Sequence, residues 1–308
     1  MWFRNARVFR FTKPFVISAE ELEEKLGTDA FKPCGPQETT RQGWVPPLGK
    51  HGELLVHSAN GYHLIALRKE EKILPGPVVK EAVEEKAEAI EMEQGRKVRR
   101  KEKEEIKEQV MLEMLPQAFS RNRRSFAYLA PQDGVLVVDA GSAKQAEDLA
   151  STLRKSLGSL PVRPPAVEQA PIFTLTGWLN QTIDLPSAVV LGDECELKDP
   201  SEDGGVVRCK GLNLKADEIR NHLEAGMEVT KLAITWDDNV SFMLDEELGI
   251  RRLKFGETLQ DQLDDVEVDD AVAKFDAAFT IMTLELSKLI PGLLEAMGGE
   301  DRSAIVEE

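Results

Sequence analysis

Apolar and polar residues alternate along many short segments of the chain, and this alternation is typical of strands with one buried face. The turn pair Asn60-Gly61 separates two such segments and is a strong hairpin signal. The predicted strands are Phe3–Phe11, Glu53–Ser58, Tyr62–Ile73, Ser125–Leu129, Val135–Asp139, Val189–Leu191, Gly205–Lys210, Glu228–Trp236, Val240–Leu244 and Ile250–Phe255.

Other segments repeat their apolar residues at helical spacing and carry helix capping signals. Ser142 is a favourable N-cap and Gly158 a C-terminal stop for one of them. Strands and helices alternate in both halves of the chain, which predicts an α+β fold. The predicted helices outside the central charged stretch are Ser18–Gly27, Ala143–Leu157, Thr174–Trp178, Ala216–Ala225 and Asp269–Met297.

The stretch from Pro75 to Arg124 predicts a long, charged helical hairpin that interrupts the strand pattern. Pro75 and Pro77 suit a first helical turn, and Gly95 suits the end of the first helix. The apolar positions of the two predicted helices are Val79, Val83, Ala87 and Ile90, and then Val98, Ile106, Val110 and Met114.

These patterns predict three parts in the chain. Residues 1–74 and 125–163 form a centre α+β domain, and residues 75–124 form an inserted helical tip. A proline-rich linker then leads to a base α+β domain at residues 164–308.

Charge sets the predicted hairpin apart from the rest of the chain. Residues 96–124 contain ten Lys or Arg and five Glu, a net charge of +5 in a chain of net charge −16. The cations Arg96–Lys101 are expected in the first turns of the second helix, where the helix dipole disfavours positive charge. An external polyanion would compensate this arrangement. The alternative is a solvated helix with i,i+4 Glu–Lys pairs.

The sequence lacks the common catalytic and cofactor motifs. It contains no GxxxxGK[ST], no GxGxxG after a strand, no HExxH and no GxSxG. Cys34, Cys195 and Cys209 are widely spaced and predict free thiols in a reducing compartment. The absence of these motifs leaves no cofactor expected. With no apolar leader and no long apolar run, we expect a cytoplasmic protein.

Two weaker constellations leave other chemistry open. His51, His57 and His63 are six residues apart, and Cys34 could supply a fourth metal ligand if the fold brought all four together. Ordinary surface or core histidines are favoured over such a metal site. The carboxylates Asp237, Asp238 and Asp245 can bind Mg²⁺ for nuclease work, but Asp residues are also common in turns.

Three aromatic residues have alternative interpretations. Trp44 and Trp178 can stack on bases, but each lies among apolar residues and is expected in the core. Phe119 follows the second helix and precedes three arginines. It either folds back onto the hairpin or anchors in the pocket of another subunit, where one aromatic can dominate an interface.

Several segments spread over the whole chain carry a resemblance to a known family. They are Gly43–Pro47, Arg68–Pro75, Leu115–Arg121, Leu153–Pro161, Glu202–Gly205, His222–Gly226, Thr230–Ala233, Leu253–Phe255 and Lys274–Asp276.

These segments resemble the bacterial recombination-associated RdgC family. The resemblance implies a ring-shaped homodimer with double-stranded DNA in a positive central hole, a nucleoid association and restraint of RecA-driven strand exchange. It also implies a sequence-independent DNA contact and no catalytic activity. Leu115 and Phe119 fall in the motif where the tips of two subunits meet. The DNA-binding residues expected from charge and resemblance together are Arg96, Lys97, Arg99, Arg100, Lys101, Arg121, Arg123, Arg124, Arg208 and Lys210.

Two positions depart from the pattern of that family. Gln117 stands where a basic residue is expected, and the segment around Arg208 and Lys210 is less basic. The leading hypothesis is a non-catalytic DNA-binding ring. The alternatives are a scaffold that docks an acidic partner protein through the basic hairpin, and a metal-dependent nuclease.

Overall fold

The computed structural model describes residues 1–264, 271–303 and 305, and it divides the chain into two compact units. The larger unit comprises residues 1–28, 46–66 and 125–308, and the smaller unit comprises residues 29–45 and 67–124. The division predicted from sequence, with residues 1–74 and 125–163, 75–124, and 164–308 as three parts, stays a prediction.

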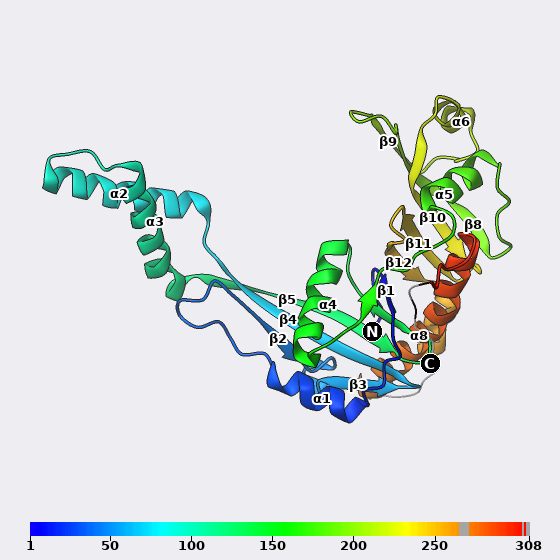
Figure 1. Cartoon of the computed structure of the whole chain (residues 1–308), viewed down its shortest axis with the longest axis horizontal. Helices are drawn as coiled ribbons and strands as arrows, with labels where there is room; N and C mark the ends of the chain where they lie inside the picture. Colours follow the sequence, from blue (N-terminus) through cyan, green and yellow to red (C-terminus); the bar gives the residue numbers. More distant parts are fainter. Residues whose placement is uncertain (265–270, 304, 306–308) are drawn as a thin grey trace. The chain divides into compact units, whose positions relative to one another are not determined.

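The first of two antiparallel sheets has seven strands in the order β2-β4-β5-β6-β1-β7, with β3 paired to β4 (Figure 1). Strands β4 and β5 belong to both units. Asn60 and Gly61 form the predicted turn between β3 and β4, with φ angles of +51° and +81° that a two-residue hairpin requires. The strands are β1 (Arg7–Phe11), β2 (Thr40–Val45), β3 (Val56–Ala59), β4 (Tyr62–Ile73), β5 (Phe119–Ala130), β6 (Val135–Val138) and β7 (Val162–Arg163).

The second sheet has five strands in the order β12-β11-β10-β8-β9 and lies wholly in the larger unit. Its central strand β10 alternates buried and half-buried residues, so one face packs on the core and the other stays open. The strands are β8 (Val189–Lys198), β9 (Val206–Lys210), β10 (Glu228–Trp236), β11 (Val240–Asp245) and β12 (Ile250–Phe255).

Eight α-helices occur in the described part of the chain, and together with the sheets they confirm the predicted α+β class. Helices α2 and α3 belong to the smaller unit, where they pack through Val79, Val83, Ala87, Ile106 and Val110. The helices are α1 (Ala19–Thr28), α2 (Gly76–Gln94), α3 (Arg100–Met114), α4 (Ala143–Leu157), α5 (Pro171–Asn180), α6 (Asp217–Glu224), α7 (Glu257–Asp264) and α8 (Ala271–Ala296).

One continuous hydrophobic core fills the larger unit. It joins Phe3 and Tyr128 of the first sheet region to Trp236 of the second sheet and to Phe279 of α8. Trp178 on α5 lies in the same core at 1 % exposure, and Trp44 of the smaller unit is equally buried. The expectation that both tryptophans are core residues is therefore confirmed.

Helix α8 is long and apolar enough, by length and composition, to cross a membrane. As expected from the sequence, α8 has no unbroken apolar run of this length, because Lys274, Asp276, Glu285, Lys288 and Glu295 interrupt it. Half of the apolar window is buried inside the structure, with Phe279, Met282, Leu286 and Leu289 in the core. The predicted start of this helix at Asp269 lies outside the described residues.

A buried ion pair joins β1 to the end of β11 within the larger unit. Arg7 Nη2 donates to Asp245 Oδ2 at 2.6 Å, and the two side chains are 7 % and 4 % exposed. Asp245 also accepts hydrogen bonds from Arg251 Nε at 2.8 Å and from the Gly249 N–H at 2.7 Å. A carboxylate buried this deeply needs all of these partners, so Arg7 is structurally important.

Replacing Arg7 by leucine is expected to lower the free energy of unfolding by about 3 kcal/mol, because Asp245 loses a buried charge partner. Urea unfolding measures the loss, and Arg4→Leu is the matched control because Arg4 is exposed. Equal losses in the two variants would contradict a special role for the Arg7–Asp245 pair.

Candidate nucleic-acid interface

The turn between α2 and α3 holds the first group of predicted DNA-binding cations. Gly95 ends α2 with a left-handed φ of +62°, and its N–H donates to Glu91 O at 2.9 Å. Helix α3 begins only at Arg100, with Arg99 as its N-cap. Arg96–Arg99 thus precede α3 and do not occupy its first turns as predicted. The glycine cap places Arg96 and Lys97 in the connection before α3, while Arg99 stands at the helix N-terminus as its N-cap.

Glu102 holds one of these cations in place. Its carboxylate accepts two hydrogen bonds from Arg96, at 2.9 and 2.6 Å, and one from the Arg99 N–H at 2.8 Å. The hydrogen bonds from Arg96 and then from Arg99 lower the pKa of Glu102 to about 2. Arg96 is therefore neutralised within the chain, although its side chain is exposed.

Other cations of the smaller unit keep their charge available to a ligand. Arg100 pairs with Glu104 at 3.6 Å, but its side chain is 96 % exposed. The smaller unit as a whole has seventeen Lys and Arg against fifteen Asp and Glu, whereas the rest of the chain carries a net charge of −18. Among the described residues, no carboxylate lies within 4.0 Å of the charged groups of Lys97, Lys101, Arg123 and Arg124, and all four are exposed.

The second group of predicted cations lies on the exposed end of β5. This strand begins at Phe119 and not at Ser125 as predicted, because residues 119–124 pair with the long neighbouring strand β4. Alternation along the strand places Arg121 and Arg123 on the face of Phe119 and Arg124 on the other face. Arg121 donates to Glu71 of β4 at 3.1 Å, and Lys69 and Arg121 together lower the pKa of that carboxyl.

Phe119 is 85 % exposed, so the alternative in which it folds back onto the hairpin is wrong. Leu115, the second predicted dimer contact, is 2 % exposed and packs inside its own chain. Of the two predicted dimer contacts, Phe119 is therefore the one that offers apolar surface.

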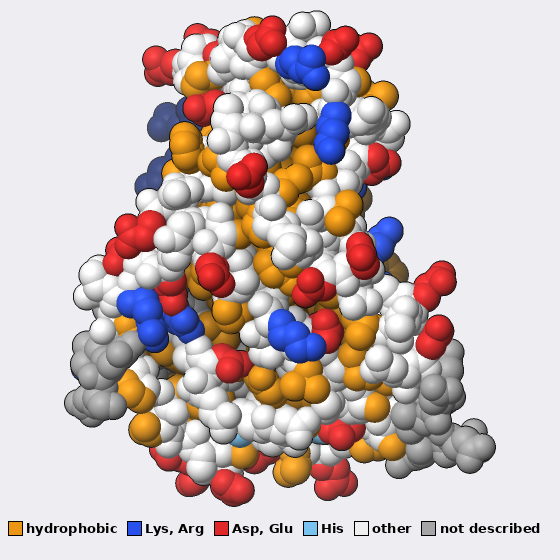
Figure 2. All heavy atoms as spheres, turned by 90° about the vertical axis from the view of Figure 1, so that its right-hand side faces the viewer, with side chains coloured by type: hydrophobic (Ala, Val, Ile, Leu, Met, Phe, Trp, Pro, Cys, Tyr) orange, Lys and Arg blue, Asp and Glu red, His pale blue; other side chains and the backbone are white. Residues whose placement is uncertain are grey.

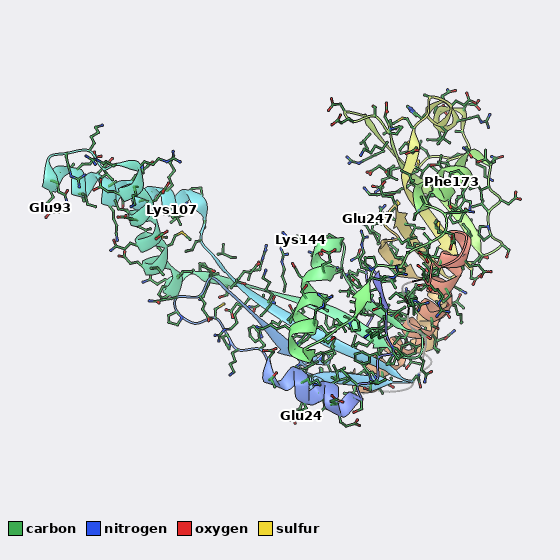
Figure 3. The ribbon with its side chains drawn as sticks, in the orientation of Figure 1. Glu24, Glu93, Lys107, Lys144, Phe173 and Glu247 are labelled. Atoms are coloured by element: carbon green, nitrogen blue, oxygen red, sulfur yellow. The ribbon has the colours of Figure 1, made fainter. Side chains whose placement is uncertain are left out.

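A groove of about 550 Å³ lies between α2 and α3 in the same unit as Phe119. Its floor is apolar and its rim is basic, with a single acid at Glu104. Lys107, on α3, is one of the rim residues (Figure 3). The floor consists of Leu74, Val79, Val83 and Met111, and the basic rim consists of Lys80, Arg100, Lys103 and Lys107.

The open face of the second sheet carries Arg208 and Lys210, the last two predicted cations. Glu196 accepts from Arg208 Nε at 2.7 Å and from Lys231 Nζ at 2.6 Å. Arg208, Glu196 and Lys231 are neighbours across strands β9, β8 and β10. Because two cations share one carboxylate, this row of three side chains keeps a net positive charge. Burial tends to raise the pKa of Glu196, but Arg208 and Lys231 lower it overall.

A second row repeats this arrangement on the same face. Glu194 pairs with Lys210 at 3.4 Å and with Arg252 of β12. Arg252 and then Lys210 lower the pKa of Glu194. Sequence reasoning missed Lys231 and Arg252. The alternation of β10 places Lys231 on the open face. Arg252 reaches the same face from a β-bulge with a left-handed φ of +52°, and the sequence pattern does not predict this bulge.

The carboxylates considered for a nuclease site are not brought together. Asp237 and Asp238 lie in the turn between β10 and β11, next to the Trp236–Val240 pair. Asp245 pairs with Lys231 at the opposite end of the same two strands, where Arg7 and Arg251 neutralise it. Within residues 1–264, 271–303 and 305, no group of three His, Cys, Asp or Glu side chains can hold a metal ion.

The spaced histidines also separate. His57 lies opposite Leu64 and His63 opposite Ser58 on the β3–β4 pair, so the two rings project from opposite faces. His57 contacts Asp276 at 3.0 Å, and His63 contacts Ser58 at 2.8 Å. Each of these two histidines therefore has a side-chain partner within its own chain.

The comparisons with known proteins agree with the resemblance in the sequence. A family model described as "RdgC: Putative exonuclease, RdgC" matches residues 1–300. The chain belongs to the RdgC family. It is 52 % identical to the recombination-associated protein RdgC of Aeromonas hydrophila, over 98 % of this chain and 100 % of that protein. The RdgC protein of Tolumonas auensis is 49 % identical, over 97 % of this chain and 99 % of its own length.

Membership in the RdgC family assigns the protein to those associated with recombination. The description of the family model also names an exonuclease. The exposed lysine and arginine side chains are of the type that contacts a phosphate backbone.

Replacing Arg96 by glutamine is expected to return the pKa of Glu102 from about 2 toward its ordinary value of 4.5, since Arg96 is the main cause of the shift. The depressed pKa means that the Arg96–Glu102 contact stabilises the helix pair above about pH 4.5, and that this contribution is lost as the pH falls to about 2.

A carbon-detected NMR titration of the Glu102 carboxyl group measures this pKa directly. Lys97→Gln serves as the control, because Lys97 is not among the causes of the shift. If the pKa of Glu102 stayed near 2 in Arg96→Gln, the assignment of the shift to Arg96 would be wrong.

Proposed function

We propose that the protein binds double-stranded DNA without reading its sequence, encircles it as a ring of two copies, and modulates homologous recombination by restraining RecA-type strand exchange. The observation that carries this proposal is the separation of charge between the smaller unit, at +2, and the rest of the chain, at −18. A local positive surface on an acidic protein directs a polyanion to one place. On this proposal the protein is cytoplasmic, associated with the nucleoid, and non-catalytic.

Charge supports a backbone contact that tolerates any sequence. Lysine and arginine side chains bind phosphates and position the duplex, whereas sequence is read at the base edges. Cations with no carboxylate partner among the described residues, such as Lys97, Lys101, Arg123 and Arg124, release the most counterions when they bind. Arg96, Arg121, Arg208 and Lys210 already have carboxylate partners and contribute less per residue.

Phe119 and the α2–α3 groove support the closure of a dimeric ring. An aromatic that is 85 % exposed is costly in water, and an apolar groove of about 550 Å³ is present in the same unit. In the ring, each Phe119 occupies the groove of the other copy. The groove rim and the arginines after Phe119 are both basic, so DNA phosphates between the copies relieve their repulsion and favour closure.

Enclosure of the duplex explains the restraint of recombination in physical terms. A ring that surrounds DNA leaves only by opening or by sliding off an end, so its dissociation is slow on closed DNA. A recombinase filament that must invade the enclosed duplex is then blocked. RecA is restrained either through this occupancy of DNA or through direct contact.

Replacing Lys97, Lys101, Arg123 and Arg124 together by glutamine is expected to weaken duplex binding and to flatten its salt dependence. Each lost phosphate contact reduces the log–log slope by about 0.9. Fluorescence anisotropy with a short duplex across a salt series measures both quantities. The matched control, Lys13→Gln with Lys155→Gln, removes exposed cations of the larger unit and should leave the slope unchanged.

An unaltered slope in the fourfold variant would exclude these side chains as phosphate contacts. Charge reversal at Arg96, Lys97, Arg99 and Arg100 to glutamate tests the turn between α2 and α3 more severely and is expected to abolish binding. Circular dichroism confirms in each case that the variant is folded.

Phe119→Ser is expected to open the ring at the tip and to speed dissociation from closed circular plasmid by about tenfold or more, since a buried aromatic contributes a few kcal/mol to an interface. Met92→Ser is the matched control, because Met92 is equally exposed at 84 % on α2. If the Phe119→Ser variant dissociated from closed circular plasmid as slowly as the parent protein does, the closure mechanism would be wrong.

A second candidate function is a scaffold that docks an acidic partner protein. The apolar floor and basic rim of the α2–α3 groove favour it. Duplex affinity that is absent or insensitive to salt would support the scaffold over the DNA ring. A nuclease is tested by cleavage of plasmid with Mg²⁺ and its loss in Asp238→Ala.

A further inference from the structure

A second cavity, of about 480 Å³, lies wholly within the larger unit and has no part in the proposed DNA contact. Four segments far apart in the sequence meet around it: β1, the first turns of α4, the proline segment before α5, and the turn between β11 and β12. The residues that matter here are Phe9 of β1, Ala143 and Ala146 of α4, and Pro164, Pro165 and Leu248 of the two connecting segments.

The walls of this cavity are apolar and well supported. Pro164 and Pro165 have no N–H groups, so their segment presents rings and carbonyl oxygens. Gly249 follows the lining residue Leu248, and a side chain at Gly249 would overlap the Arg7 guanidinium. The glycine allows Arg7 to lie against the turn, where the Arg7–Asp245 pair fixes one side of the cavity.

The lining also includes three acidic side chains. Glu147 comes from α4, and Glu246 and Glu247 come from the turn between β11 and β12. Figure 3 shows Glu247 on the side of this unit where α4 begins, marked by Lys144. Glu247 contacts Arg7 at 3.1 Å, but its side chain is 63 % exposed. In the described part of the chain, no cation lies within 4.0 Å of the exposed carboxylates of Glu147 and Glu246.

We propose that this cavity is a docking site for a basic segment of a partner protein, in which a bulky apolar side chain is flanked by lysine or arginine. The volume falls within the range of specific binding pockets, about 300 to 1,000 Å³. The apolar side chain enters between the prolines and α4, and the flanking cations meet Glu147 and Glu246. This proposal does not depend on DNA binding by the smaller unit.

Charge decides against other classes of ligand. Nucleic acid and acidic peptides are repelled by three carboxylates around one cavity, because the cation that lines it, Arg7, is already paired with Asp245 and Glu247. A small cation alone would leave the apolar walls in contact with water. A segment that combines cationic flanks with an apolar anchor satisfies both features.

The probe is a fluorescein-labelled hexapeptide with two leucines between pairs of lysines, titrated by anisotropy at 0.15 M salt. The full-length protein is expected to bind it saturably. Replacing both leucines by glycine is expected to weaken binding at least tenfold, since the anchor is lost. Glu147→Gln with Glu246→Gln is expected to weaken it by about threefold to tenfold, the range for exposed charge pairs.

Two variants separate this site from general attraction to an acidic protein. Ala143→Trp fills the cavity from a half-buried position at the start of α4 and is expected to weaken binding at least tenfold. The control pair, Glu24→Gln with Glu218→Gln, removes the same charge from exposed positions on α1 and α6 and should change the affinity less than twofold.

Four results would overturn the proposal. They are the absence of saturable binding, equal affinity for the glycine peptide, an equal loss in the Glu24–Glu218 control pair, and unchanged binding by Ala143→Trp. The glutamine variants alter exposed side chains, so they remain informative even if Ala143→Trp lowers stability.

Discussion

The concentration of positive charge on one part of an acidic protein is the constraint on which the rest of this structure depends. Like charges repel, so a basic surface persists only where fixed carboxylates or an external anion offset it. Glu102, Glu71, Glu196 and Glu194 supply the internal part of this compensation, each by holding a cation of the candidate interface. Cations with no carboxylate partner among the described residues, above all Arg123 and Arg124, are the ones that an external anion would neutralise.

The shared carboxylates also explain how the sheet of the larger unit presents its cations. Glu196 and Glu194 each lie between two basic side chains, which orders long flexible residues without cancelling their charge. Ordered cations lose less side-chain entropy when they bind a phosphate backbone. An acidic overall composition is therefore compatible with a surface suited to DNA. Some acidic side chains hold the cations in position, and the others are spread over the rest of the surface. Figure 2 shows acidic side chains scattered over one face of the molecule, around a central apolar band.

Local patterns in the sequence predict most of the regular structure. Strands β4, β10 and β12 and helix α4 have the bounds expected from alternation and capping, because each has one buried face and clear terminal residues. The start of β5 was not predictable from its own residues, because Phe119–Arg124 are extended only through pairing with β4. Charge located the cations of the smaller unit, but the partners of Arg208 and Arg252 depend on contacts between separate strands. Glu102 follows Arg96 by only six residues, yet it reaches Arg96 through the non-helical turn before α3, which the charge pattern did not predict. The cavity at Arg7 was likewise hidden, since its four walls meet only in the folded chain.

The most direct test of the central claim is the affinity of the unmodified protein for a short duplex of arbitrary sequence, measured across a salt series with an equal length of single strand as competitor. The proposal predicts tight duplex binding that resists the single strand and weakens steeply with salt, with a log–log slope of about −0.9 per phosphate contacted. Absence of duplex binding at low salt would contradict it and would leave an RdgC-family fold whose basic surface serves another partner.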